Sequence, residues 1–108
     1  MVLTRNFRET IQARARRDPR YRRSLLTESV NELLSGDLNA GKAILRDYIN
    51  ATVGFGLLAD HLDKSSKSLQ RMLGPGGNPT AENIFGILKV LQEYEDIQLQ
   101  VKSRKNAA

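Results

Sequence analysis

The chain contains no cysteine, no tryptophan, only three prolines and a single histidine, His61, in its 108 residues. The absence of cysteine excludes disulfides, thiol nucleophiles and thiolate metal sites. With one histidine, neither a conventional zinc site nor a Ser-His-Asp triad can be assembled. No apolar run approaches the length of a membrane span, and the N-terminus lacks the apolar core of a signal peptide. The composition therefore predicts a cytoplasmic protein that is not an enzyme and holds no cofactor or metal.

The net charge of +5 is concentrated at the N-terminus. Residues 1–23 contain eight arginines and only two acidic residues, Glu9 and Asp18. Such a stretch suits a phosphate backbone or an acidic partner, but a solvated helix face has the same composition. Both interpretations of this basic extension stay open on the sequence alone.

Two helices are predicted before residue 36. Thr4 is a candidate cap for the first, which runs toward Arg17. Asp18-Pro19 starts the second, because a capping residue followed by proline in the first turn is a strong start signal. The inward positions of these two helices recur at helical spacing. They are Phe7, Ile11 and Ala15, then Leu25, Leu26, Val30, Leu33 and Leu34.

Four more helices are predicted between residues 37 and 96. Asp37 caps one that continues to about Gly54, and two short helices follow at residues 55–62 and 65–73, the latter capped by Ser65. Residues 74–79 form a turn-rich loop that no helix would tolerate, and Thr80 caps a last long helix. The expected core positions of the first and last of these helices are Leu38, Gly41, Leu45, Tyr48, Ile49, Thr52, Ile84, Ile87, Leu88 and Leu91.

The C-terminal tail alternates apolar and polar residues, with Ile97, Leu99 and Val101 apolar. This is strand periodicity, and a lone strand is marginal unless it pairs with another. We therefore expect a short C-terminal strand that pairs with a second chain. The predicted organisation is a basic helical extension at 1–36, a core at 37–96, and a strand and tail at 97–108.

The two short helices have the apolar spacing of a helix-turn-helix, in which two packed helices need a small residue where they touch. Ala59 takes that place, and the apolar residues around it are Leu58, Leu62, Leu69 and Met72. Asp63 stands at the turn position that is usually glycine, and aspartate can adopt the left-handed conformation required there. Lys64 follows where an apolar residue is usual. A pair of purely structural helices would show the same spacing.

Several stretches resemble a known family of regulators. They are Leu58-Ala59, Ser65 to Leu69, Met72-Leu73, then Gly-Asn-Pro-Thr at 77–80 and Ile-Leu-Lys-Val-Leu at 87–91. This pattern resembles the Xre/Cro-type antidote proteins of addiction (toxin–antitoxin) modules, over about residues 37 to 101. Residues 42–52 are also similar to a wider set of bacterial regulators of this size.

The resemblance implies an all-α, lambda-repressor-like helix-turn-helix domain, here with two extra N-terminal helices and the C-terminal strand. It implies a transcriptional regulator that binds double-stranded DNA sequence-specifically as a homodimer, and an autorepressing antitoxin with a RelE-type toxin as partner. The residues expected to contact base edges are Ser66, Lys67 and Gln70. Those expected to contact phosphate are Lys64, Arg71, Asn78 and Thr80. The family often has a polar residue where this chain has Phe55, which we expect in the core.

Two other functions fit the sequence. The chain could be an interaction module that binds a toxin or another protein without specific DNA binding. It could also be a nonspecific nucleic-acid binder driven by the arginine cluster.

Overall fold

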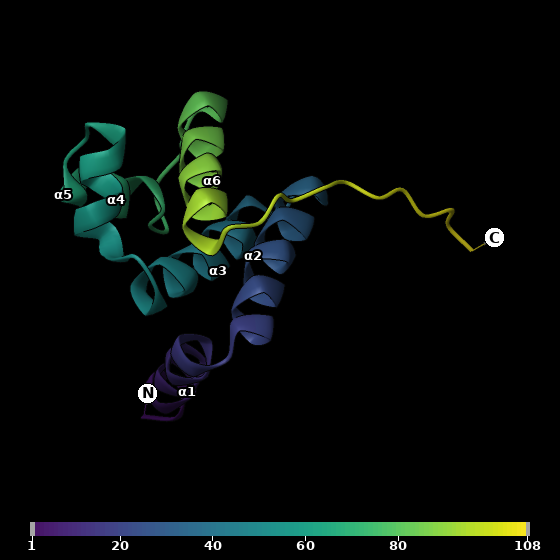
Figure 1. Ribbon diagram of the computed structural model, residues 1–108, viewed down its shortest axis with the longest axis horizontal. Helices are drawn as coiled ribbons and strands as arrows, with labels where there is room; N and C mark the ends of the chain where they lie inside the picture. The colour runs from purple at the N-terminus through teal and green to yellow at the C-terminus, as the bar shows by residue number, and fades with distance from the viewer. Residues whose placement is uncertain (1, 108) are drawn as a thin grey trace.

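The computed structural model describes residues 2–107, with side chains from residue 10 onward, and within this range it contains helices and no strand. The all-α prediction is confirmed. The helices are α1 (Val2–Arg17), α2 (Pro19–Leu34), α3 (Leu38–Ala51), α4 (Gly54–Leu62), α5 (Ser66–Met72) and α6 (Ala81–Glu95). Figure 1 shows α3 between the N-terminal pair α1 and α2 and the C-terminal group α4 to α6. None of the helices described is long and apolar enough to cross a membrane.

Four helices begin at the predicted capping residues. The Asp18 carboxylate accepts from the backbone N–H groups of Arg20 and Tyr21, and Asp37 caps α3 in the same way. Ser65 and Thr80 cap α5 and α6. Each cap satisfies a backbone donor that has no partner within its own helix. The prediction for Thr4 is wrong, because α1 already begins at Val2.

One hydrophobic core joins α2 to all the C-terminal helices. Its buried members are Leu26, Leu45, Tyr48, Ile49, Val53, Phe55, Leu58, Ala59, Leu69, Leu73, Ile84, Ile87, Leu88 and Leu91. The helices α3 and α2 pack closely at Gly41, where an added Cβ would lie 2.6 Å from the Leu33 side chain. The basic extension is therefore packed onto the core through α2. Of the predicted inward residues, Phe7 lies outside the described side chains.

Leu34 was predicted to face inward and is 63% exposed. It is the last residue of α2, and the chain turns away at Gly36, which has a φ of +89°. The C-terminal tail passes beside it, with Leu99 and Val101 lining the same hollow as Leu34. The helical spacing of the apolar residues in α2 was predicted correctly, but the last of them, Leu34, lies beyond the part of α2 that α3 covers.

The predicted C-terminal strand is not seen: residues 97–107 are extended and form no ladder with any part of the described chain. The tail starts against α6, where the Gln92 side chain accepts from the backbone N–H of Leu99 at 2.8 Å. Ile97 and Leu99 pack at the edge of the core, whereas Val101 is 77% exposed. Figure 1 shows the tail passing α2 and leaving the body of the protein. A strand needs a neighbouring strand edge, and the helical body provides none.

Candidate nucleic-acid interface

The turn between α4 and α5 has the geometry predicted for it. Asp63 is left-handed, with φ 54° and ψ 45°, and the N–H of Lys64 donates to the Ala59 carbonyl at 3.0 Å. Phe55 is 8% exposed, which confirms its expected core position, and Ala59, the expected contact residue between the two helices, is buried at 3% exposed. The other residues of the apolar frame, Leu58, Leu62, Leu69 and Met72, are buried or packed against the core.

The outer face of α5 carries the polar side chains that the spacing predicted. Lys67, Gln70 and Arg71 are exposed, and Ser66 is half-buried. The Gln70 amide donates to the Ser66 hydroxyl one helical turn earlier, at 3.0 Å. Ser66 therefore orients Gln70, which is a role that the sequence did not assign to it.

The loop after α5 extends this face. Lys67, Gln70 and Arg71 line one shallow hollow together with residues 74–77. Arg71 also lines a second hollow, shared with Asn78 and Thr80. Five of the seven predicted contact residues thus line these two adjoining hollows, which are formed by α5, the loop and Thr80. The other two lie outside both hollows: Ser66 is half-buried on α5, and Lys64 is exposed in the turn before it.

Two basic residues of α3 hold this loop from beneath, and the sequence reasoning missed both. The Lys42 side chain is 1% exposed, and its ammonium donates to the carbonyls of Gly74 at 2.9 Å and Gly77 at 2.6 Å. The Arg46 guanidinium donates to the Leu73 carbonyl. Lys42 stands next to Gly41 and three residues before Leu45, where the apolar stripe of α3 predicts a hydrophobic residue. A charge in that stripe was the signal that could have found it.

A second buried polar cluster was also missed. The Glu95 carboxylate, 9% exposed at the end of α6, accepts from the Tyr48 hydroxyl at 2.7 Å and from Arg22 Nε. Arg23 Nε lies 3.8 Å from the other carboxylate oxygen. Arg22 also donates to the Ala15 carbonyl at 2.9 Å, so the cluster joins α1, α2, α3 and α6. Burial, and then the hydrogen bond to Glu95, raise the pKa of the Tyr48 hydroxyl, which keeps it protonated as a donor.

The arginine cluster at the N-terminus serves more than one purpose. Arg22 is committed to the buried cluster, whereas Arg16, Arg17 and Arg20 are exposed. Arg14 lies 4.2 Å from the centre of the Tyr21 ring. Figure 1 shows α1 at a different end of the molecule from α5. The basic extension and the α5 surface are thus separate features.

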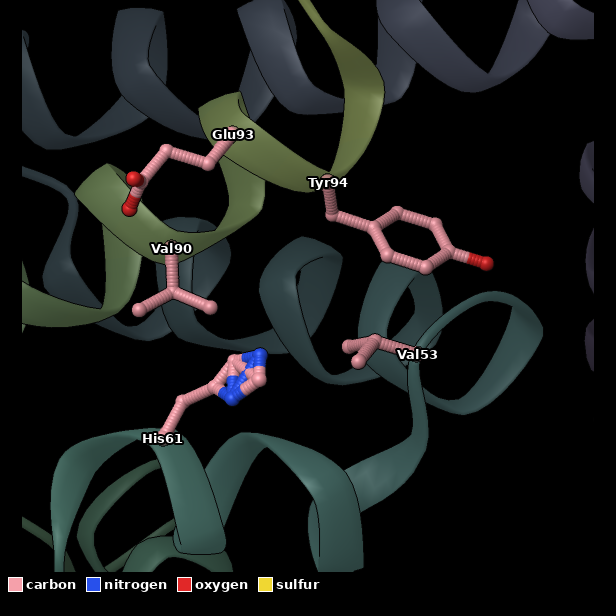
Figure 2. Close-up of a pocket in the computed structure, with 5 residues that line it drawn as sticks. All are labelled: Val53, His61, Val90, Glu93 and Tyr94. Atoms are coloured by element: carbon pink, nitrogen blue, oxygen red, sulfur yellow. The ribbon is translucent and has the colours of Figure 1, made fainter.

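The lone histidine lies in a hollow of about 250 Å³ between α4 and α6. In Figure 2 the His61 ring points toward Val90 across this gap, while the Glu93 carboxylate points away from it. Tyr94 closes the side near Val53. Among the described residues no group of three histidines, aspartates or glutamates is placed to hold a metal ion.

Comparison of the chain with models of protein families, with characterised proteins and with solved structures finds no match.

Proposed function

We propose that the protein is a sequence-specific DNA-binding transcriptional regulator in which α4 and α5 form a helix-turn-helix. The observation that carries the proposal is the surface of α5 and the following loop, where five of the predicted polar or basic side chains gather over a buried apolar frame. The left-handed turn at Asp63 is the connection that such a motif requires. The proposed site of action is the cytoplasm, as predicted from the composition.

In this proposal α5 enters the major groove. Lys67 would donate to guanine O6 and N7, and Gln70 would form a bidentate pair with adenine. Ser66 would contribute by orienting the Gln70 amide through the hydrogen bond it accepts, as well as by its own base contact. Phosphates on either side would be held by the residues of the turn, the helix end and the loop. These are Lys64, Arg71, Asn78 and Thr80.

Replacing Lys67 or Gln70 with alanine is expected to weaken binding to the preferred site by about 1–3 kcal/mol and to relax the sequence preference. The preferred duplex would be obtained by selection from a random pool with the wild-type protein, and affinities measured by fluorescence anisotropy. Lys89→Ala, an exposed lysine on α6, is the matched control and should bind like the wild type. An equal loss on every sequence would make these two residues phosphate contacts instead.

We further propose that the protein binds DNA as a homodimer. The unpaired C-terminal tail, with its exposed Val101, leaves a surface that a second copy could cover. Two recognition helices about 34 Å apart would then meet successive major grooves of a palindromic site. Light scattering should give twice the chain mass, and a monomer both alone and with DNA would contradict the dimer.

The antitoxin role rests on the family resemblance alone. A small basic RelE-type protein encoded next to this gene, and its binding to this chain, would support an autorepressing antitoxin. The alternative, an interaction module without specific DNA binding, predicts toxin binding but no selected duplex. A binder driven by the arginine cluster predicts affinity that falls with salt equally for all sequences. These outcomes separate the three functions.

A further inference from the structure

We infer that Lys42 is a positioning residue that fixes the loop at residues 74–77 and, through it, the DNA-contact surface; this inference rests on the proposed function. The ammonium of Lys42 bridges the two ends of the loop, since it donates to both the Gly74 and the Gly77 carbonyl. The side chain reaches the loop from α3, so the bridge ties the loop to the centre of the fold.

The position of Lys42 argues for a specific task. Its side chain is 1% exposed and lies in the apolar stripe of α3. Burying an ammonium costs free energy that a methionine of similar length would not, unless the charge is well bonded. Here both hydrogen bonds go to loop carbonyls, and hydrogen bonds from a charged donor are about twice as strong as neutral ones. The charge is therefore placed where it restrains the loop.

The loop needs such a restraint. Three of its four residues are glycine, and glycine has the widest choice of backbone conformations. Within the loop, the backbone bond that closes the turn runs from the Gly77 N–H to the Gly74 carbonyl, at 3.0 Å. Arg46 adds a bond to Leu73, the last residue before the loop. Lys42 and Arg46 together anchor three carbonyls, those of Leu73, Gly74 and Gly77.

The same loop shapes the surface proposed to meet DNA. Residues 74–77 line the hollow with Lys67 and Gln70, and Gly77 continues into the hollow of Arg71 and Asn78. Contact groups have to be held within about 0.5 Å of their working positions to be effective. A loop released from Lys42 would therefore move Asn78 and change the surface beside Arg71.

The test compares Lys42→Met with the wild type in two measurements on the full chain. In the free protein, hydrogen exchange of the amides at 74 and 76–78 should become faster while exchange in α3 and α6 stays near the wild-type rate. Affinity for the duplex selected by the wild type should fall about tenfold or more, and affinity for random duplex should fall as well, because Asn78 and Arg71 are proposed phosphate contacts. Leu26→Ala is the control for stability, because it removes core packing on α2 and none of the hydrogen bonds to the loop.

A merely structural role for Lys42 predicts a different pattern. Exchange would then rise across the core as in Leu26→Ala, and the affinity of the folded protein, measured well below its unfolding temperature, would be unchanged; that pattern overturns the inference. If Lys42→Met does not fold, the same two measurements on Arg46→Met decide, since Arg46 is half-buried and holds the adjacent carbonyl. If the wild type selects no duplex, the proposed function fails, and the exchange measurement alone decides whether Lys42 positions the loop.

Discussion

Replacing Gly77 with alanine is expected to destabilise the fold by about 1–3 kcal/mol, the range for overpacked positions, and to remove most of the proposed DNA binding. A Cβ at this position would lie 2.2 Å from the Met72 carbonyl oxygen and 2.3 Å from that of Arg71. Both are backbone atoms of the last turn of α5, which cannot rotate away as a side chain can. The loop would have to lift, and the hydrogen bond from Lys42 to the Gly77 carbonyl would be lost.

The neighbouring residue supplies a matched control for this substitution. A Cβ on Gly76 would meet nothing within 4 Å, so Gly76→Ala should leave stability within about 0.5 kcal/mol of the wild type. Urea denaturation would measure the stability of both variants, and anisotropy with the selected duplex their binding. If Gly77→Ala matched Gly76→Ala in both measurements, the close packing of the loop on α5 would be wrong.

Replacing Glu95 with alanine is expected to lower the free energy of unfolding by about 3 kcal/mol, the lower end of the cost of breaking a buried ion pair. The substitution leaves the Arg22 guanidinium, whose side chain is 20% exposed, without its carboxylate, and the buried Tyr48 hydroxyl without its acceptor. Because Arg22 is partly exposed, water solvates part of its charge, and the loss of stability stays at the lower end of that range. The midpoint of urea denaturation would measure it.

Two comparisons isolate the effect of Glu95 from that of its helix. Glu93→Ala changes an exposed carboxylate on the same turn of α6 and should shift stability by less than about 0.5 kcal/mol. The triple variant Arg22→Met, Tyr48→Phe, Glu95→Leu removes the carboxylate together with its two hydrogen-bond donors and should recover most of the loss, because the Tyr48 hydroxyl and the Arg22 guanidinium are no longer left without their acceptor. A triple variant as unstable as Glu95→Ala would mean that packing, and not the charge, determines the cost.

Local rules made much of the fold predictable. The capping residues Asp18, Asp37, Ser65 and Thr80 act on backbone groups two or three residues away, so they can be read from the sequence. The apolar periods located the inward faces of α3 to α6 for the same reason. The turn at Asp63 could be placed from its separation from Ala59 in the sequence. The exposed face of α5 could be predicted because it lies opposite the apolar residues that face the core.

Residues at long sequence separation could not be paired in this way. Lys42 bonds to Gly77 across 35 positions and Arg22 to Glu95 across 73. Each of these charged residues occupies a place where the period of its helix predicts an apolar side chain. The period says that the place is buried, but it does not say which distant group will satisfy a charge there. Only the assembled core brings those partners together.

The segment from α4 to the loop separates the features that the sequence predicts from those that only the tertiary structure decides. By itself the sequence determined two short packed helices, the left-handed turn between them and the polar face of α5, since all three follow from spacing within a few turns. The tertiary structure decided that the loop at 74–77 continues this face and that Lys42 and Arg46 hold it from α3. It also decided that the tail remains an unpaired extended segment, because a strand depends on a neighbour that a helical body does not provide.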